Sequence, residues 1–364
     1  MAIVNRRIKV MHIISGDLWA GAEVQAYTLL KELQPLLDLH VILMNNGELA
    51  EKLIARKIPV SVLDESRMSA AKILLQMRRI MLMFKPDIVH THRQKENILG
   101  ALANLFSTRS PSVRTSHGAP EFAAKGLRRV QVALDRWIGS YLQQGIISVS
   151  GDLAEKLKKN FPPEKIWTIP NGIDVEKIKE EAGTNQKANQ ELHIGIIGRL
   201  EPVKRVDIFL NMAALLMERC HEKQLMFHII GDGSLRQPLE VQSNRMGLND
   251  RVIFYGHRKD IPSRINGLDV VVMCSDHEGT PMTALETLAL GVPLVGHNVG
   301  GLREILEPYP HLLVDDHTPQ GYAAAVARVL EKRTGKVELA PKYLAAHNAV
   351  LTTELYASLL HRSL

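Results

Sequence analysis

The chain has 364 residues, of which 45% are hydrophobic and 23% are charged, so its composition is that of an ordinary globular protein. A chain of this length is longer than one typical domain, so two domains of roughly 150 to 200 residues each are expected. The formal net charge of +6 indicates attraction to anions such as phosphates, anionic lipid or nucleic acid. Aromatic residues make up only 5% of the chain, and no zinc-finger, RNP-type or basic-zipper pattern is present, so nucleic-acid binding is not expected.

The beginning of the sequence carries an apolar run from Ile8 to Ile14 that His12 interrupts. No small-residue cleavage pattern follows it, so we interpret the run as a first strand and not as a signal peptide. No apolar stretch approaches the roughly 18 residues of a membrane-spanning helix. The two cysteines, Cys220 and Cys274, lie far apart, which fits a reducing compartment without a disulfide framework. These features favour a cytoplasmic protein whose contact with a membrane would be peripheral.

Short apolar runs alternate with longer amphipathic stretches in the first half of the chain. This alternation is typical of strands and helices around a parallel sheet. The amphipathic stretches 22–33 and 70–84 predict two of the helices. The runs predicted to form strands are 9–15, 39–44, 60–63, 88–91, 112–116 and 145–149.

A polar stretch at 178–191 interrupts this alternation and predicts an interdomain linker. A second alternating series follows, with predicted strands at 193–197, 225–230, 252–255, 270–274, 293–296 and 312–314. We therefore expect an α/β protein of two Rossmann-like, doubly wound domains that face each other across a cleft. The first would comprise residues 1–177, joined by a C-terminal helix at 343–364, and the second would comprise residues 192–342. Ligands bind such folds at the carboxyl ends of the strands.

A first motif lies at a predicted turn from strand to helix, where Gly198 is followed by Arg199 and Lys204. Two cations five residues apart can converge on a diphosphate and stabilise the charge that grows on a departing nucleotide. A solvated basic turn is the alternative interpretation of the same residues. Turns of this kind bind anions often but not always.

A second motif follows the predicted strand 270–274 and contains two carboxylates. Glu278 lies in a loop, and Glu286 lies inside the helix that follows. Two carboxylates at these places suit recognition of sugar and ribose hydroxyls, although a helix-terminal charge and a solvated helix face explain them as well. The residues between them offer backbone amides at a helix N-terminus, where a phosphate is favoured. These residues are Gly279, Thr280, Pro281, Met282 and Thr283.

A third motif joins the first predicted strand to the first helix and contains Gly21. A glycine there lets the backbone approach a ligand closely, and the free amides of the helix start point outward. The spacing does not match the three-glycine dinucleotide fingerprint. A nicotinamide-dependent oxidoreductase is therefore disfavoured, because neither half supplies that fingerprint with its acidic ribose-binding partner.

The combination of these segments, in this order, resembles the retaining glycosyltransferases of family 4, which have the GT-B fold. Arg199 and Lys204 match the family's phosphate-binding pair, and Glu278 and Glu286 match its two glutamates with seven residues between them. Further matching segments, spread over nearly the whole chain, are Gly21-Ala22-Glu23, Asn171-Gly172-Ile173-Asp174, Gly231-Asp232-Gly233 and Gly300-Gly301 before Glu304.

The resemblance implies a role for each matching position. Glu278 would hold hydroxyls of the transferred sugar, and Glu286 would bind the ribose hydroxyls. His117 matches a cleft histidine near the transferred sugar, and residues near His257 and Arg258 would line the base. The remaining donor-binding positions implied by the resemblance are Gly21, Gly198, Gly231, Gly279, Thr280, Pro281, Met282 and Thr283, with the amides of Met282 and Thr283 on the diphosphate.

The resemblance also implies the reaction, in which a hexose moves with retention from a UDP- or GDP-linked donor to a glycan or lipid-linked acceptor. No cofactor or metal ion is expected, because Arg199 and Lys204 would take the place of a metal on the leaving diphosphate. A departing phosphate oxygen would help to deprotonate the acceptor on the same face. The sequence departs from the family pattern at Ala20, where glycine is common, and at Thr280, where an aromatic or aliphatic residue is frequent; the second change bears on donor preference.

Two other features carry alternatives. His90 and His92, with His117, suggest a metal site, but no carboxylate spacing completes one, so we expect these histidines to serve the donor or acceptor instead. The segments 68–84 and 122–137 are apolar and basic, which fits either binding to an anionic membrane or ordinary packing on the domain. A catalytically silent carbohydrate-binding relative is the remaining functional alternative, although all four charged residues of the predicted cleft are present.

Overall fold

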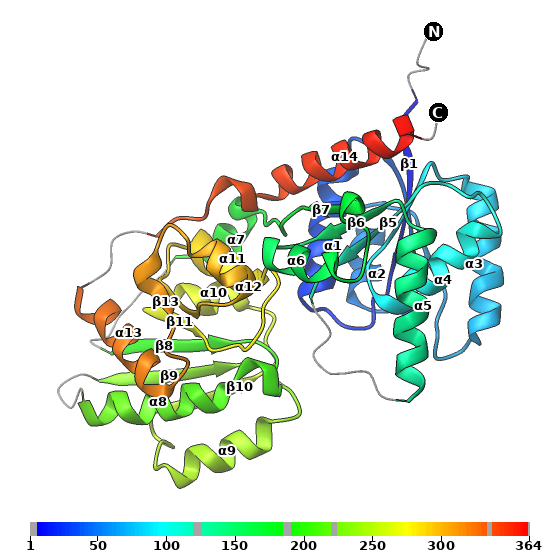
Figure 1. Ribbon diagram of the computed structural model, residues 1–364. Coiled ribbons are helices and arrows are strands. Elements are labelled where there is room, and N and C mark those ends of the chain that lie inside the picture. The colour runs from blue at the N-terminus through cyan, green and yellow to red at the C-terminus, as the bar shows by residue number, and fades with distance from the viewer. Residues whose placement is uncertain (1–5, 119–125, 185–190, 220–223, 333–336, 363–364) are drawn as a thin grey trace. The chain divides into compact units, whose positions relative to one another are not determined.

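The computed structural model describes residues 6–118, 126–184, 191–219, 224–332 and 337–362 (Figure 1). The chain forms two compact units. The first contains the residues up to Gly172 together with Leu344–Leu364, and the second contains Ile173–Tyr343. The expected linker at 178–191 begins inside a helix of the second unit, α7 (Val175–Ala182), and residues 185–190 lie outside the described residues.

The first unit is built on a parallel seven-stranded sheet with the order β3-β2-β1-β4-β5-β6-β7. Its strands are β1 (Lys9–Ile14), β2 (Asp38–Leu43), β3 (Val60–Val62), β4 (Ile88–Thr91), β5 (Ser112–Ser116), β6 (Gly145–Ser148) and β7 (Ile166–Thr168). Its helices are α1 (Gly21–Leu33), α2 (Glu48–Ala55), α3 (Ala70–Phe84), α4 (Gln94–Leu105), α5 (Leu127–Tyr141), α6 (Gly151–Lys158) and α14 (Ala345–Arg362).

Strand β1 shows how the sequence builds two layers of helices around this sheet. Successive side chains of a strand point to opposite faces. Val10 and Ile14 pack into one cluster of buried residues, which includes side chains of α1 and α14. Met11 and Ile13 pack into a second cluster with side chains of α3. His12 has the same parity as Val10 and Ile14, so it lies on the face that α1 and α14 cover.

The C-terminal helix α14 belongs to the core of the first unit, to which Figure 1 shows it returning in red. Its buried side chains Leu355, Tyr356 and Leu359 join the same cluster as Val10. Asn348 Nδ2 donates a hydrogen bond of 2.6 Å to the carbonyl of Pro170, which fixes the start of the helix. Burial of each large apolar side chain contributes roughly 1.5–3 kcal/mol, so this helix stabilises the unit substantially.

The second unit contains a parallel six-stranded sheet with the order β10-β9-β8-β11-β12-β13. Its strands are β8 (Leu192–Ile197), β9 (Leu225–Ile230), β10 (Val252–Gly256), β11 (Val270–Met273), β12 (Leu294–His297) and β13 (Leu313–Val314). Its helices are α7 (Val175–Ala182), α8 (Val206–Arg219), α9 (Arg236–Arg245), α10 (Ile261–Asn266), α11 (Met282–Ala289), α12 (Gly300–Ile305) and α13 (Pro319–Lys332).

In each sheet the strand order reverses beside the first strand of the unit. The chain runs from β1 to β2 and β3 and then returns to place β4 on the other side of β1. In the second unit β8 and β11 have the same relationship. The loops that follow such a pair of strands diverge and leave room for a ligand at the carboxyl ends. Both sheets are Rossmann-like, as the alternating sequence pattern predicts.

Every strand predicted from the sequence is present, with ends that agree within one residue. Strand β7 was not predicted because it is short and lies at the edge of its sheet, where its three residues are partly or fully exposed and show no apolar run. The predicted segment 122–137 lies partly outside the described residues, and its helix α5 begins at Leu127. Among the described helices, none is long and apolar enough to cross a membrane.

Candidate active site

The turn after β8 carries the first motif and is packed tightly against the turn after β9. A Cβ atom placed on Gly231 would lie 1.9 Å from the carbonyl oxygen of Gly198, so only glycine permits this approach of the two backbones. The amide of Gly198 donates to Ile230, and the amide of Leu200 donates to Asp232. These contacts explain why Gly198 and Gly231 occur at the ends of neighbouring strands, and they fix the position of the basic turn.

Lys204 ends a short 3-10 turn, and its ammonium Nζ lies 2.5 Å from Glu278 Oε1. The two side chains are only 21% and 9% exposed, so water screens this ion pair weakly. The amide of Asp276 donates to the carbonyl of Val203, which ties the same two loops together through their backbones. The loops after β8 and β11 thus meet at the reversal point of the second sheet, and they bring the first two sequence motifs into contact.

Arg199 lies in the same turn and is exposed to solvent. A small cavity beside the turn is lined by Gly198, Arg199 and Lys204 and, from the end of β11 and its loop, by Cys274 and Ser275. Burial raises the pKa of the Cys274 thiol well above its usual range, so this side chain is an inert part of the wall. Cys220 lies outside the described residues. The two predicted phosphate-binding cations therefore border one hollow.

The pair Gly300-Gly301 at the start of α12 supports the loop that carries Glu278. A Cβ atom on Gly301 would lie 1.6 Å from the carbonyl oxygen of Gly279, and one on Gly300 would lie 2.2 Å from that of Glu278. The amide of Gly301 donates a 3.2 Å hydrogen bond to the carbonyl of Glu278. The two glycines therefore let α12 lie directly against the Glu278–Gly279 backbone, which is a positioning role.

Helix α11 starts at Met282, after Pro281 as its N-cap, and no side chain caps it. The first amides of a helix, here those of Met282 and Thr283, have no carbonyl acceptor inside the helix. The helix dipole adds about 0.3–1 kcal/mol of attraction for an anion at this end. Thr280 before it is buried, so its side chain helps to shape the loop. The predicted diphosphate-binding segment therefore has a local geometry suited to an anion.

Glu286 lies one turn further along α11. Burial, with a smaller effect from the negative charge of Glu181, raises the pKa of the Glu286 carboxyl to about 7. A glutamate would normally titrate near 4.3, so the raised pKa marks a carboxyl group held in poorly solvated surroundings. Perturbed carboxyl groups of this kind cluster at functional sites.

His257 and Arg258 follow β10, in the neighbouring loop. His257 is exposed, and Arg258 makes two hydrogen bonds of 2.8 Å with the carboxylate of Asp260. Asp260 also accepts a hydrogen bond from Arg264. The N–H groups of Arg258 that bind Asp260 are thus already engaged, and a planar guanidinium held in this way can still stack on a flat ring through its face.

Sequence reasoning missed a charged group beside the motif at the end of β11. Asp276 Oδ1 lies 3.4 Å from Arg205 and 3.1 Å from His317 Nε2. The ring of His317 stacks on that of His297 with centroids 3.8 Å apart. Arg205 has a positive φ of 48°, a conformation uncommon for a residue with a side chain. No pattern in the sequence links His317 to Asp276, because 41 residues separate them.

The remaining predicted site residues lie in the first unit. Gly21 is the first residue of α1 and is exposed. Two residues later, the fully buried Glu23 pairs with Arg93 at 2.5 Å, and Arg93 also contacts Asp17. Burial raises the pKa of Glu23, while Arg93 opposes this shift. The Gly21 turn, which follows β1, is therefore anchored to the loop after β4. The strand order of the first sheet reverses between these two neighbouring strands.

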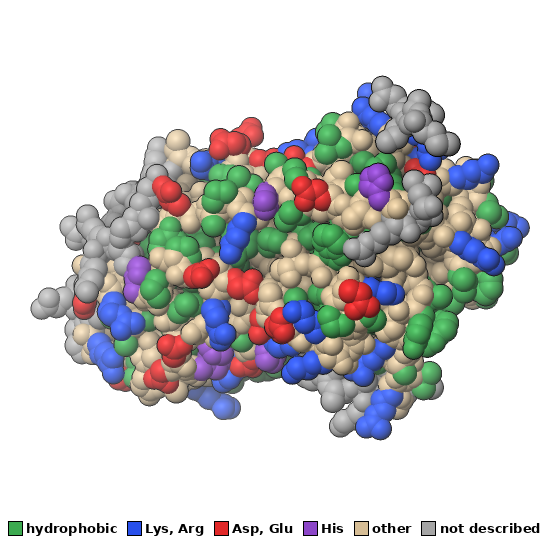
Figure 2. All heavy atoms as spheres, turned by 45° about the horizontal axis from the view of Figure 1, so that its top comes forward, with side chains coloured by type: hydrophobic (Ala, Val, Ile, Leu, Met, Phe, Trp, Pro, Cys, Tyr) green, Lys and Arg blue, Asp and Glu red, His purple; other side chains and the backbone are tan. Residues whose placement is uncertain are grey.

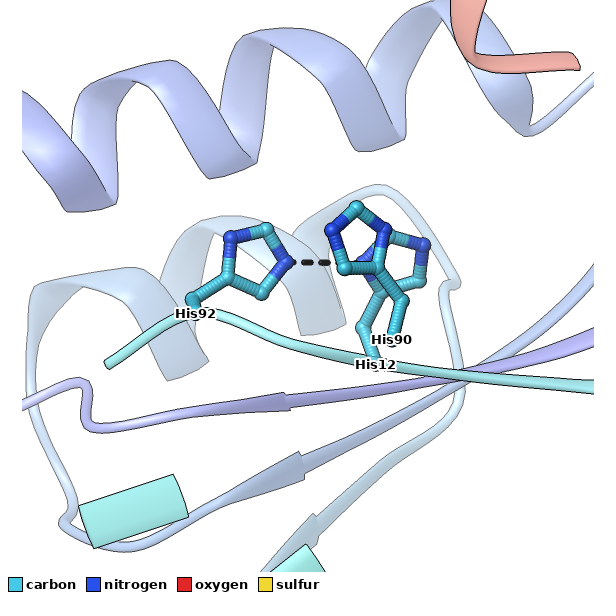
Figure 3. Close-up of side chains that lie close together, drawn as sticks. All are labelled: His12, His90 and His92. Atoms are coloured by element: carbon cyan, nitrogen blue, oxygen red, sulfur yellow. Dashed lines mark hydrogen bonds between the residues drawn. The ribbon is translucent and has the colours of Figure 1, made fainter. Parts of the chain in front are cut away.

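His117 follows β5 and contacts a cluster of histidines that the sequence only partly predicted. His12, His90 and His92 each place one ring nitrogen within 4.8 Å of the others (Figure 3). His92 Nδ1 lies 3.4 Å from His117 Nε2. Burial lowers the pKa of all four rings, to about 3 for His12 and about 4 for His117. Sequence reasoning missed His12, although it is the polar residue that interrupts the first apolar strand.

The geometry of this cluster favours hydrogen bonding over metal binding. Both nitrogens of His90 lie within hydrogen-bonding distance of hydroxyl groups, 2.6 Å from Tyr356 and 2.7 Å from Thr115. The rings of His90 and His92 are stacked, with an interplanar angle of 16°. Because imidazole lone pairs lie in the ring plane, stacked rings cannot direct them at one common centre. These contacts support hydrogen bonding as the role of His90 and His92, and the absence of a metal site stays a prediction.

Models of two protein families match almost the whole chain. The model described as Glycosyltransferase Family 4 matches residues 19–177, and the model described as Glycosyl transferases group 1 matches residues 177–344. The first match covers most of the first unit, and the second covers the second unit with all the motif residues after Gly198. These matches confirm the expected glycosyltransferase family and give no support to the nicotinamide-dependent alternative.

Characterised proteins and solved structures agree with these matches. The chain is 28% identical to an Escherichia coli UDP-Gal:alpha-D-GlcNAc-diphosphoundecaprenol alpha-1,3-galactosyltransferase, over 92% of this chain and 90% of that protein. It is 25% identical to the capsular polysaccharide biosynthesis glycosyltransferase CapM of Staphylococcus aureus, over 81% and 80%. The structure of Anabaena Alr3699/HepE in complex with UDP-glucose superposes with a TM-score of 0.76 at 20% identity, and 98% of each chain is covered. The chain belongs to the group 1, family 4 glycosyltransferases and has their GT-B fold.

Proposed function

We propose that this protein is a retaining, metal-independent hexosyltransferase that moves a sugar from a UDP-linked donor to a hydroxyl of a lipid-linked glycan. Its product would enter a cell-surface polysaccharide or glycolipid. The observation that carries the proposal is the meeting of the β8 and β11 loops, where Lys204 contacts Glu278 and Arg199 borders the same hollow. This arrangement supports the proposal, in which the two cations bind the diphosphate and the carboxylate binds the sugar.

The donor side of the proposal follows from charge and hydrogen-bonding capacity. An ammonium group has three donors, so Lys204 can keep its bond to Glu278 and still donate two hydrogen bonds to phosphate oxygens. Arg199 and the amides of Met282 and Thr283 would complete the binding of the diphosphate. Structures similar to this chain contain UDP or UDP-glucose, which supports a uridine rather than a guanosine donor.

The proposed mechanism needs no base beyond the donor itself. As the bond from the anomeric carbon to the diphosphate breaks, negative charge grows on the leaving oxygen, and Arg199 and Lys204 stabilise it. The same oxygen accepts the proton of the acceptor hydroxyl, which attacks on the face that the diphosphate leaves. Glu278 holds hydroxyls of the sugar in place. Two side-chain cations then do the work that a divalent metal does in other transferases.

The acceptor side rests on the relatives. The E. coli protein is named for a diphosphoundecaprenol-linked acceptor, and the staphylococcal protein is named for capsular polysaccharide synthesis. An acceptor on such a lipid stays in the membrane, so an enzyme whose described helices do not cross a membrane would have to reach the membrane surface. We therefore include peripheral contact with the cytoplasmic face of an anionic membrane in the proposal.

Helix α5 supports this membrane contact. Val130, Leu134, Trp137 and Tyr141 lie on one helix face, and their side chains are 38–71% exposed. Arg136 is exposed next to this stripe. Such an apolar stripe beside basic residues is typical of helices that lie in a membrane interface.

Helix α3 repeats the arrangement. Its side chains Leu75, Leu82 and Met83 are exposed, and Arg78 and Arg79 are exposed among them. Figure 2 shows hydrophobic and basic side chains next to one another at the right-hand end, where α3 lies in Figure 1. We call the exposed apolar and basic residues of α3 and α5 the apolar-basic surface.

A transfer assay with a panel of UDP- and GDP-linked hexoses tests the proposed function. The protein is incubated with each donor and a diphosphate-linked lipid acceptor, with and without a chelator, and the anomeric configuration of the product is read by NMR. We expect transfer from a UDP sugar and the same rate with and without chelator. The anomeric configuration of the transferred sugar should be the same in the product as in the donor. Inversion, or loss of activity with chelator, would reject the mechanism. Binding of UDP without transfer or donor hydrolysis would identify a catalytically silent relative.

A further inference from the structure

The buried histidines of the first unit form one continuous row of hydrogen bonds. Thr115 Oγ1 lies 2.7 Å from His90 Nε2, and His90 Nδ1 lies 2.6 Å from the hydroxyl of Tyr356. That hydroxyl lies 3.4 Å from His12 Nε2, and His12 Nδ1 lies 3.0 Å from His92 Nε2. His92 Nδ1 then reaches His117 Nε2 at 3.4 Å. The row therefore starts at Thr115 and ends at His117, two residues further along the same strand end.

When every donor of the row is used, including the hydroxyl proton of Tyr356, the connectivity allows only two arrangements of protons. A neutral imidazole has one N–H donor and one acceptor nitrogen, and burial keeps these rings neutral. Each link joins the Nδ1 of one ring, directly or through the Tyr356 hydroxyl, to the Nε2 of the next. If one ring carries its proton on Nδ1, its neighbours have to do the same. All four histidines are therefore Nδ1–H tautomers together or Nε2–H tautomers together.

Both ends of the row lie on one small cavity. Thr115 and His117 line it, and so do Asn348 and Thr352 of α14. His117 Nδ1, Asn348 Oδ1 and Thr352 Oγ1 are buried, and none of them has a hydrogen-bond partner among the described residues. Asn348 and Thr352 are only 4% and 1% exposed. A buried polar atom without a partner costs about 1–3 kcal/mol, so three at one cavity indicate something that binds them.

The size and chemistry of the cavity fit a single water molecule. The centre of a water molecule can occupy a space of about 10 Å³ in this cavity, which is about what one water molecule needs. If the histidines are Nδ1–H tautomers, His117 and Thr352 donate to the water, and Thr115 and Asn348 accept from it. If they are Nε2–H tautomers, Thr115 and Thr352 donate, and His117 and Asn348 accept. In either case the water has two donors and two acceptors, which is its full capacity.

We propose that a water molecule in this cavity joins His117 Nδ1 to Thr115 Oγ1 and closes the row into a ring of hydrogen bonds that fixes the tautomer and orientation of His117. Three residues of α14 take part in it. Asn348, Thr352 and Tyr356 are spaced by four residues, so they lie on one face of the helix. The C-terminal helix therefore positions His117 at the carboxyl end of the first sheet. Packing of the helix alone would need only an apolar face.

The hydrogen-bonded ring also accounts for the histidine cluster without a metal ion. A divalent ion bound by His12, His90 and His92 would need one free lone pair from each ring. The contacts of His90 with Tyr356 and Thr115 already use both of its nitrogens. The ring and the metal site are therefore mutually exclusive, and metal content distinguishes them.

The first test reads the tautomers directly and uses the full-length protein without any donor or acceptor. With ¹⁵N-labelled histidine, long-range proton–nitrogen NMR spectra show which nitrogen of each ring carries the proton. Single substitutions such as His92→Gln assign the signals. We expect His12, His90, His92 and His117 to be neutral at pH 7 and to share one tautomer. A mixture of tautomers, a charged ring, or a stoichiometric metal ion in the purified protein would overturn the proposal.

The second test uses the sign of a stability change. Thr352→Val replaces the hydroxyl by a methyl group of the same shape. If the hydroxyl binds the water, the variant unfolds at a lower denaturant concentration than the wild type; a hydroxyl without a partner would make the variant more stable. Thr353→Val is the matched control, because the neighbouring hydroxyl binds only the carbonyl of Ala349 among the described residues. We expect a larger loss for Thr352→Val than for Thr353→Val, and equal or increased stability of Thr352→Val would contradict the proposal. Neither test depends on the proposed sugar transfer.

Discussion

Lys204 Nζ lies 2.5 Å from Glu278 Oε1, so the cation that we assign to the donor diphosphate is paired with the carboxylate that we assign to the sugar. The pair joins the loops after β8 and β11 at the point where the strand order of the second sheet reverses. Each side chain limits the freedom of the other before a donor arrives. This order lowers the entropic cost of placing both groups on the donor.

Glu278→Gln distinguishes the proposed role of Lys204 in diphosphate binding from that of Glu278 in sugar binding. The substitution removes the negative charge beside Lys204, so the diphosphate of UDP no longer competes with the Glu278 carboxylate for Lys204. We expect UDP affinity, measured by calorimetry, to stay equal or to rise by up to about tenfold, a change of 1.4 kcal/mol. The transfer rate should fall by about 100-fold, because the sugar loses its carboxylate partner. Glu240→Gln, which affects an exposed carboxylate on α9, is the control. A parallel loss of UDP affinity and rate would contradict the assigned roles.

Glu286→Gln tests the raised pKa of the buried carboxyl. A glutamate whose pKa is about 7 in the folded protein favours folding while it is protonated, and this contribution disappears as the pH rises from its unfolded pKa through 7. Gln stays neutral, so the variant should be more stable than the wild type at pH 8, by at most about 3 kcal/mol. The difference should shrink toward pH 5. Unfolding midpoints measured over this range check the prediction, and a pH-independent difference would refute it.

Nucleotide binding should depend on the same titration of Glu286, but it should favour the ionised carboxylate, whereas folding favours the protonated form. If the Glu286 carboxylate accepts hydrogen bonds from the ribose hydroxyls, protonation below pH 7 removes one acceptor. UDP affinity of the wild type should therefore fall between pH 8 and pH 6, and the affinity of Glu286→Gln should be lower at pH 8 and nearly flat. Calorimetric titrations at three pH values provide the measurement. An affinity that is equal in both proteins at pH 8 would exclude the ribose contact.

Gly301→Ala tests the support of the Glu278 loop. The new Cβ atom would lie 1.6 Å from the carbonyl oxygen of Gly279, so either α12 or the loop has to move. We expect a loss of stability of about 1–3 kcal/mol and a lower transfer rate at saturating donor. Gly267→Ala is the control, because its Cβ would have no neighbour closer than 3.5 Å. Equal stability and activity of the two variants would show that the close approach has no functional role.

The apolar-basic surface predicts binding to anionic vesicles. Leu134→Glu combined with Trp137→Glu places charges in the exposed stripe of α5 and should weaken sedimentation with phosphatidylglycerol vesicles at least about tenfold, because two apolar side chains no longer enter the interface. Val241→Glu changes an equally exposed apolar residue on α9 and is the control. Binding that does not depend on anionic lipid, or that survives the α5 changes, would exclude this surface.

The sequence predicted the strands well because buried parallel strands are short, continuous apolar runs. Strand β11, with four buried residues, is such a run, whereas the edge strand β7 has only three residues, which are partly or fully exposed. The positions of Arg199, Lys204 and Glu278 after their strands also followed from the order of the motifs. The parallel direction of the strands then brings their loops to one edge of the sheet.

The contacts of the site could not be predicted in the same way, since they join residues that are distant in the sequence. Asp276 meets His317 from a loop 41 residues away, and Tyr356 meets His12 across 344 residues. The only sequence signal for His12 is a polar residue within an apolar strand. The polar residues of α14 gave no signal by themselves, because a surface helix carries polar residues on its outer face as well.

The most direct test of the central claim compares UDP with UMP in the wild type and in Arg199→Ala and Lys204→Ala. The two nucleotides differ by one phosphate, so the ratio of their dissociation constants isolates the contribution of the diphosphate. We predict that each variant reduces the wild-type preference for UDP by about 10- to 100-fold and leaves UMP binding nearly unchanged. If both variants keep the wild-type preference for UDP, the two cations do not hold the diphosphate and the account is wrong.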